Sequence, residues 1–190
     1  LLNQANLSSA LLTNANLSGA NLFGVNLSDA SLNNADLTNA ILIGATLTDA
    51  NLTNATLTNA NLSGANLFGV NLSGANLFGA SLFGLNLGNA ELGGANLGGA
   101  DLSNANLSGA DLRFASLFGA DLTNAILANV VGLPQTFGNG STLYNANTDF
   151  TGTFFDPVAA GWTLVAVPEP STALLLGIGL SALAVRREKR

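Results

Sequence analysis

The sequence of 190 residues contains no cysteine and no histidine. Disulfide bonds, thiolate chemistry and the usual zinc sites are therefore excluded, and so are catalytic triads that need either side chain. The single lysine, Lys189, lies next to the C-terminal residue, so the body of the chain cannot hold a P-loop or a Schiff base. We expect a protein that is not an enzyme, with no catalytic, cofactor-binding or metal-binding residues.

Charge is scarce and unevenly placed. Only 8% of the residues are charged, against about a quarter in an average protein. Residues 1–170 carry ten acids and one base, Arg113, for a net charge of −9. The other four basic residues are Arg186, Arg187, Lys189 and Arg190. Nucleic acid phosphates are bound through clustered Lys and Arg, so we expect no direct binding of nucleic acid.

A five-residue repeat fills most of the chain. From Leu2 to Leu127 leucine occupies every fifth position, at 26 of 26 sites, and alanine follows three residues later in 22 of them. Two residues after each Leu stands Gly, Asn or Asp in 23 cases, and the residue before each Leu is usually polar. The unit is A-[N/D/S/T]-L-x-[G/N/D], called a pentad below.

This period excludes a helix and a single long strand. In a helix, successive leucines would rotate by about 140° and spread over every face. In one strand, an odd period sends alternate leucines to opposite faces. A quarter-turn at each Gly, Asn or Asp solves both problems, because four pentads then close a square coil and residues twenty apart stack. In this register Asn6, Asn26, Asn66, Asn86 and Asn106 share a column, for which we expect an amide ladder along the axis.

Residues 2–131 resemble the pentapeptide-repeat family, whose motif is A-[D/N]-L-x-x. The resemblance implies an all-β fold, a right-handed quadrilateral β-helix with the central Leu and the preceding Ala pointing inward. At twenty residues per coil the repeat would make about 6.5 coils.

Several apolar side chains fall at positions that should point to solvent. In the twenty-residue register Phe23, Ile43 and Phe83 lie on one face, and Phe78 and Phe118 on another. Exposed apolar clusters often mark contacts with partners. These five residues are candidates for a contact surface, and scattered surface phenylalanines without a function are the alternative.

The repeat loses its register at Gly132-Leu133-Pro134. An imperfect pentad with a central Phe follows at residues 148–152. The end of a solenoid exposes core and unpaired strand edges, which need to be covered. We therefore expect residues 132–166 to form an irregular cap and a linker.

The last segment, VPEPSTALLLGIGLSALAVRREKR (residues 167–190), has a Pro-Glu-Pro motif, an apolar run and a basic end. A hydrophobic helix over the apolar run, residues 173–185, would reach about 20 Å, short of the ~30 Å hydrocarbon core. The basic end would stay cytoplasmic.

This tail is similar to the PEP-CTERM sorting signal. The resemblance implies recognition of Pro168, Glu169 and Pro170 by an exosortase, and a membrane stop made by the four basic residues of the tail, Arg186, Arg187, Lys189 and Arg190. It implies a precursor held transiently in the inner membrane of a Gram-negative bacterium and a mature protein at the cell surface or outside the cell. The chain starts in mid-repeat without Met, so we expect a preceding segment with an export signal.

The sequence therefore predicts a solenoid at residues 1–131, a cap and linker at 132–166, and a sorting and transmembrane tail at 167–190. The leading functional hypothesis is an exported, surface-sorted scaffold of an exopolysaccharide or biofilm matrix. Its partners would be extracellular polysaccharide or another surface protein. The alternative is an acidic rod that mimics DNA and binds gyrase, as some pentapeptide-repeat proteins do, although only seven acids occur in residues 2–131.

Overall fold

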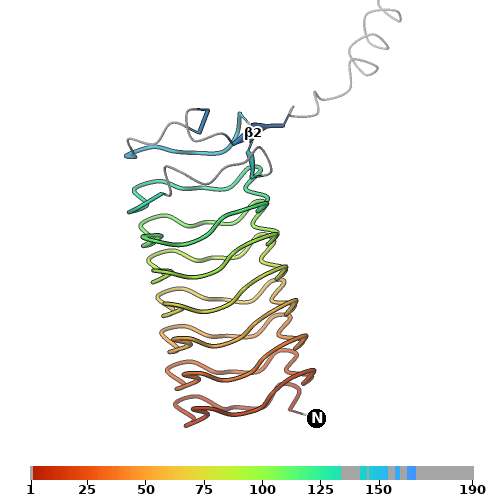
Figure 1. The fold of residues 1–190 in the computed structure, drawn as a ribbon. Helices are drawn as coiled ribbons and strands as arrows, with labels where there is room; N and C mark the ends of the chain where they lie inside the picture. Colours follow the sequence, from red (N-terminus) through yellow and green to blue (C-terminus); the bar gives the residue numbers. More distant parts are fainter. Residues whose placement is uncertain (1, 134–141, 145, 154–156, 159–161, 166–190) are drawn as a thin grey trace, which may run out of the picture.

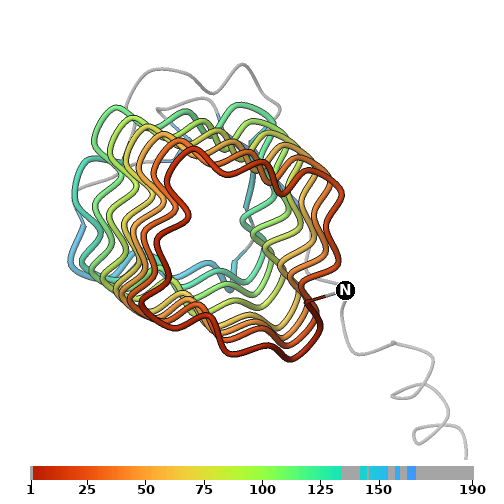
Figure 2. The ribbon, with the colours of Figure 1, turned by 90° about the horizontal axis from the view of Figure 1, so that it is seen from below.

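The computed structural model describes residues 2–133, 142–144, 146–153, 157–158 and 162–165. The chain winds into a straight stack of coils (Figure 1) with a four-lobed outline along the axis (Figure 2). Seen from the N-terminal end in Figure 2, the chain turns clockwise as it recedes, so the β-helix is right-handed. The hydrophobic helix and the sorting signal predicted for the tail lie outside the described residues.

Parallel pairing between coils has a spacing of twenty residues. Every fifth residue from Asn6 to Asp111 pairs with the residue twenty positions later. The first of these pairs is Asn6 with Asn26, and the last is Asp111 with Val131. Each coil therefore holds four pentads, as the period predicts, whereas the total number of coils stays a prediction. Apart from these single-residue bridges, the described strands are β1, Leu143–Tyr144, and β2, Thr163–Leu164.

The corner of each pentad is a turn with a left-handed residue. At all 26 sites two residues after the leucine, φ lies between +55° and +72°, the region in which Gly, Asn and Asp are least strained. The pentad that starts at Asn16 is representative. The N–H of Ala20 donates to the carbonyl of Leu17 at 3.0 Å, and the N–H of Leu17 donates to the carbonyl of Asp36 in the next coil at 2.7 Å. The bond from the N–H three residues after the leucine to the leucine carbonyl recurs in all 26 pentads, so each turn is closed by its own hydrogen bond.

Where Asn or Asp precedes the leucine, its side chain also accepts a hydrogen bond from its own turn. The Oδ1 atom of Asn16 accepts the N–H of Ser18 at 3.0 Å, an Asx turn. The amide ladder predicted for the column of Asn6 is wrong, because no side-chain hydrogen bond joins the described asparagines of this column to one another. The Oδ1 atoms of this column accept the backbone N–H two residues later, at Ser8, Ser28, Phe68, Gly88 and Ser108.

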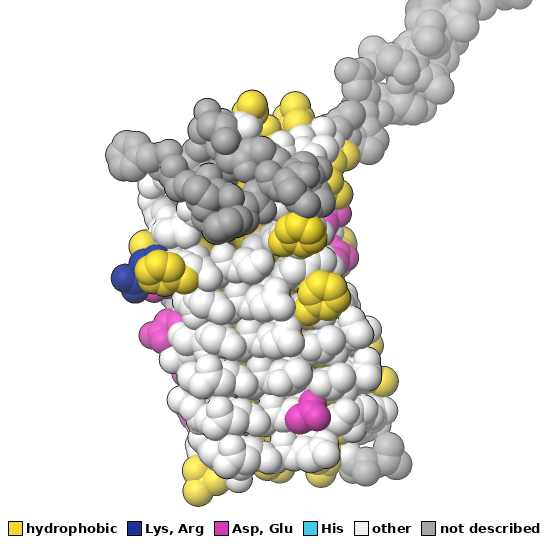
Figure 3. Space-filling view, viewed as in Figure 1, with side chains coloured by type: hydrophobic (Ala, Val, Ile, Leu, Met, Phe, Trp, Pro, Cys, Tyr) yellow, Lys and Arg dark blue, Asp and Glu magenta, His cyan; other side chains and the backbone are white. Residues whose placement is uncertain are grey.

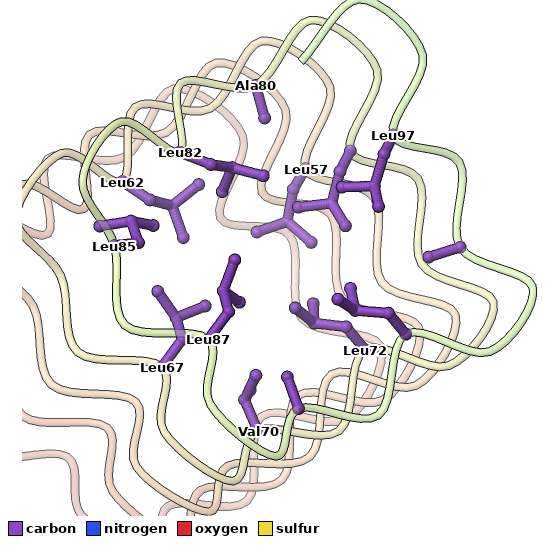
Figure 4. Packing of buried hydrophobic residues seen from close by; sticks show 14 of the residues in the cluster. Leu57, Leu62, Leu67, Val70, Leu72, Ala80, Leu82, Leu85, Leu87 and Leu97 are labelled. Atoms are coloured by element: carbon purple, nitrogen blue, oxygen red, sulfur yellow. The ribbon is translucent and has the colours of Figure 1, made fainter. Parts of the chain in front are cut away.

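The leucines fill the interior in stacked columns. Every repeat leucine from Leu22 to Leu127 is at most 2% exposed, and Figure 4 shows leucines such as Leu67 and Leu87 pointing inward from one wall. In the first coil, Leu7, Leu12 and Leu17 are only partly buried. The β-helix therefore has a continuous apolar core, as the inward Leu and Ala positions predict.

The Asx turns should contribute measurably to stability. The Oδ1 atom of Asn51 accepts three hydrogen bonds, from Thr53 N at 3.0 Å, Thr53 Oγ1 at 2.7 Å and Asn33 Nδ2 at 3.1 Å. We expect Asn51→Ala to lower the free energy of unfolding by about 1–2 kcal/mol. Asn51→Asp keeps the acceptor and is the matched control, expected to change stability by less than about 0.5 kcal/mol. Thermal unfolding followed by circular dichroism measures both; equal effects of the two variants would contradict the assigned role.

Beyond the repeat, the chain adds to the last coil with a shifted register. Leu143 pairs with Asp121 and Asp149 pairs with Ile126, which are separations of 22 and 23 residues instead of twenty. Strand β1 then pairs in parallel with β2. The imperfect pentad keeps the features of the repeat, since Asp149 Oδ1 accepts the N–H of Thr151 at 2.8 Å and Gly152 has φ +75°.

An aromatic cluster continues the leucine core into this segment. The ring of Tyr144 lies 6.0 Å from that of Phe150 and 6.4 Å from that of Trp162, and the last two rings are 6.1 Å apart. Tyr144 and Trp162 are buried and belong to the same apolar cluster as the leucines. The described residues contain no helix that is long and apolar enough to cross a bilayer.

Candidate functional site

The residue after each leucine occupies what we call the x position, and its side chain points outward. These side chains form the outer surface of the four walls of the β-helix. Phe23, Phe78, Phe83 and Phe118 occupy x positions and are 45–51% exposed, whereas Ile43 is only partly exposed. The structure thus places these residues on the two faces that the register predicts. A contact role for them stays a prediction.

One coil lacks side chains at three successive x positions. Gly88, Gly93 and Gly98 follow each other on three adjacent walls; we call these residues the glycine belt. On two walls a phenylalanine of the preceding coil lies over the glycine. A Cβ on Gly88 would lie 3.5 Å from Cδ2 of Phe68, and a Cβ on Gly98 would lie 3.1 Å from Cδ2 of Phe78. Both glycines are buried in consequence.

The third wall of the glycine belt is open. Twenty residues before Gly93 stands Ser73 instead of phenylalanine, and the nearest atom to a Cβ on Gly93 would be the carbonyl oxygen of Arg113 at 3.7 Å. A shallow groove of about 500 Å³ results, called the Gly93 groove below. Its lining residues are Ser73, Glu91, Gly93, Asp111, Arg113 and Phe114.

The groove has a charged rim. Arg113 pairs with Asp111, with Nε at 2.9 Å from Oδ1 and Nη2 at 2.5 Å from Oδ2. The hydrogen bond from Arg113 lowers the pKa of Asp111, and the same contact raises the pKa of Arg113. Oε2 of Glu91 accepts a hydrogen bond from Nδ2 of Asn71 at 2.6 Å. In Figure 3 the dark blue side chain, which is the one Lys or Arg of the described residues, lies beside a hydrophobic side chain at the edge of the rod.

Phe114 is unusual in both conformation and exposure. It occupies the left-handed corner position of its pentad with φ +63°, where a bulky side chain is strained. Its side chain is also 94% exposed. Neither Phe114 nor the glycine belt was predicted from the sequence as part of a site, although the corner position of Phe114 and the alignment of the glycines with Phe68, Ser73 and Phe78 are visible in the twenty-residue register.

The other predicted site residues fall elsewhere. The sorting motif (Pro168, Glu169 and Pro170) and the basic tail residues lie outside the described residues. Among the residues that the structure describes, no three or more Asp and Glu side chains are close enough to hold a metal ion together.

These features define a class of protein: a rigid β-solenoid built from pentads, with an outer surface made of x-position side chains. Eight copies of the model for pentapeptide repeats match residues 1–29, 20–59, 45–84 and 86–124. The chain belongs to the pentapeptide-repeat family, whose members are typically structural or binding proteins without catalytic activity. The model for the PEP-CTERM protein-sorting motif matches residues 166–190, which implies recognition by exosortase-type processing.

Similar solved structures come from several organisms. The pentapeptide-repeat protein Rfr23 of the cyanobacterium Cyanothece 51142 is 41% identical, with 52% of this chain and 64% of that chain covered and a TM-score of 0.46. A pentapeptide-repeat protein of the Arabidopsis thaliana thylakoid lumen is 33% identical over 54% of this chain and 68% of that chain, with a TM-score of 0.47. QnrB1, a plasmid-mediated fluoroquinolone resistance protein, is 21% identical over 95% of this chain and 90% of that chain, with a TM-score of 0.38. The comparison with curated proteins gave no match.

Proposed function

We propose that this protein is an exported, non-catalytic scaffold that is sorted to the cell surface of a Gram-negative bacterium. The observation that carries the proposal is the combination of a pentapeptide-repeat solenoid with a PEP-CTERM motif in one chain. A repeat rod with a fully apolar core and a hydrogen-bonded backbone is stable without ligands, which suits a passive structural role.

The proposal divides the chain into three parts. Residues 1–131 are the solenoid, residues 132–166 are the cap and linker, and residues 167–190 are the sorting and transmembrane tail. The aromatic cluster that continues the leucine core supports the middle part as a cap, because it covers apolar surface that an open end would expose to water.

Within the tail, Pro168, Glu169 and Pro170 are the proposed recognition motif for the exosortase. The four basic residues of the tail would hold the precursor in the inner membrane by staying on its cytoplasmic side. After processing, the rod would lie outside the cell in an exopolysaccharide or biofilm matrix. Its exposed phenylalanines would contact polysaccharide or another surface protein.

Mapping the C-terminus of the mature protein tests the sorting step. The chain is fused to an export signal and expressed in a host that contains an exosortase. We expect most of the protein at the cell surface, shortened near the Pro-Glu-Pro motif. Glu169→Ala should leave the uncleaved precursor in the inner membrane, whereas Glu91→Gln, a carboxylate change in the solenoid, should be sorted normally. A cytosolic protein with an intact Arg190 would exclude the proposal.

Mimicry of DNA toward gyrase is the second candidate. The small number of acidic residues argues against it, and they lie on different walls. Asp101 and Asp121 share one column, whereas Asp111 belongs to another. Inhibition of gyrase supercoiling by the purified chain would favour this function over surface sorting.

A further inference from the structure

The Gly93 groove lacks the phenyl ring that covers the glycine on each of the two neighbouring walls. On the two neighbouring walls of the glycine belt, a six-membered phenyl ring lies on the glycine, with ring carbons 3.5 Å and 3.1 Å from the Cβ positions of Gly88 and Gly98. The same wall geometry recurs at Gly93, but the residue twenty positions earlier is Ser73, which has no ring. The two filled positions therefore show that a flat six-membered ring fits against this surface.

The rim of the groove differs from that of the two filled slots. Glu91, Asp111 and Arg113 line it and offer carboxylate acceptors and guanidinium donors. Beside them stands the ring of Phe114, which is 94% exposed and has both faces available. An aromatic face attracts the weakly positive C–H groups of a stacked ligand.

We propose that the Gly93 groove binds one pyranose ring of a neutral glycan. The sugar ring has the size of the phenyl rings that cover Gly88 and Gly98. Its C–H face would stack on Phe114, and its hydroxyl groups would bond to Glu91 and to the guanidinium of Arg113. Two carboxylates and one guanidinium give the rim a net charge of −1, so an acidic sugar is repelled.

The charged rim favours a sugar over a phenylalanine of a partner protein. A hydrocarbon ring in this groove would remove water from Glu91 and Arg113 without replacing its hydrogen bonds, which is unfavourable. Sugar hydroxyls replace those bonds. The inference rests on the proposed function only in that an exported rod meets glycans outside the cell.

Calorimetric titration of the purified full chain tests the site, with cellohexaose and maltohexaose as neutral probes. We expect saturable binding of at least one probe with a Kd of about 1 mM. Ser73→Phe should weaken it about tenfold or more, because the new ring would cover Gly93 as Phe68 covers Gly88. An oligogalacturonate of equal length should bind about tenfold more weakly than the neutral probe.

Phe114→Asn separates binding from folding. Asparagine tolerates positive φ better than phenylalanine does, so the unfolding temperature of this variant should be about 2 °C higher than that of the parent chain. Binding of the neutral probe should nevertheless fall about tenfold. Leu11→Ser removes an apolar side chain that is 87% exposed and lies outside the groove, and it should leave binding unchanged.

The proposal is overturned if neither neutral probe binds at 10 times the expected Kd, or if Ser73→Phe and Phe114→Asn both bind like the parent chain. Displacement of the probe by a phenylalanine-containing peptide with higher affinity would assign the groove to a protein partner instead. Because these titrations use purified protein, their failure leaves the sorting experiment unaffected, and failure of sorting leaves the titrations interpretable.

Discussion

Replacing Leu72 by alanine is expected to lower the free energy of unfolding by about 3–4 kcal/mol. Leu72 is fully buried in the middle of the solenoid. Its backbone N–H is bonded to the carbonyl of Glu91 at 2.7 Å, and its carbonyl accepts the N–H of Ala75 at 2.9 Å. With the backbone held from two sides, the walls cannot collapse into the cavity, so most of the lost packing is not recovered.

The matched control is Leu12→Ala, the same substitution at the same pentad position in the first coil. Leu12 is only partly buried, so its loss should cost about 1–2 kcal/mol. Guanidinium unfolding followed by circular dichroism compares the two variants. Equal losses would mean that burial does not set the contribution of a leucine in this solenoid.

The substitution Gly132→Ala is expected to have the second large effect, lowering the free energy of unfolding by at least about 3 kcal/mol. Gly132 has φ +75°, and a Cβ placed there would lie 2.7 Å from Cα and 2.9 Å from the backbone nitrogen of Arg113. Backbone atoms cannot rotate away as a side chain can, so the chain must shift where it leaves the repeat. The segment that carries Tyr144 and Trp162 should then pack less well on the last coil.

Gly64→Ala isolates the conformational part of this effect. Gly64 has φ +67° and no atom within 4 Å of its Cβ position. The free energy of unfolding of the alanine variant should therefore fall only by the strain of a left-handed alanine, about 1–2 kcal/mol. Unfolding measures both variants, and fluorescence of Trp162, the single tryptophan, reports on the last coil. If Gly132→Ala leaves that fluorescence unchanged and costs no more than Gly64→Ala, close approach to Arg113 has no structural importance.

Much of the fold could be predicted because the repeat states the same physical requirement 26 times. Each pentad has a leucine that must be buried and, two residues later, a residue that tolerates positive φ. This pattern is compatible with a square coil and incompatible with a helix. Confirmation comes from the buried leucines, the twenty-residue pairing and the positive φ at every corner. The imperfect pentad around Asp149 was also visible, because its Asx residue and glycine keep their spacing.

The side-chain details of the walls were harder to predict. Asn6 and its column could form an axial amide ladder as well as Asx turns, because one Oδ1 atom can accept two hydrogen bonds, as that of Asn76 does from Phe78 N and Asn96 Nδ2. The turn bond forms in every member of the column because the N–H two residues later lies at hydrogen-bond distance within the same pentad. Composition does not reveal in which columns the ladder forms as well.

The candidate site shows the same limit. Gly88, Gly93 and Gly98 are ordinary repeat variants when they are seen one at a time. Only the stacked coils show that Phe68 and Phe78 cover two of them and that Ser73 leaves the third open. The strain at Phe114 could be inferred from its corner position in the pentad, and its φ of +63° shows the strain directly.

By itself, the sequence determined the period, the inward leucines, the family and the sorting motif, because each depends on residues in fixed local spacing. The tertiary structure decided which walls are filled and which is open, and where the chain leaves the repeat against Arg113. Those outcomes depend on atoms twenty residues apart that meet only when one coil lies on the next.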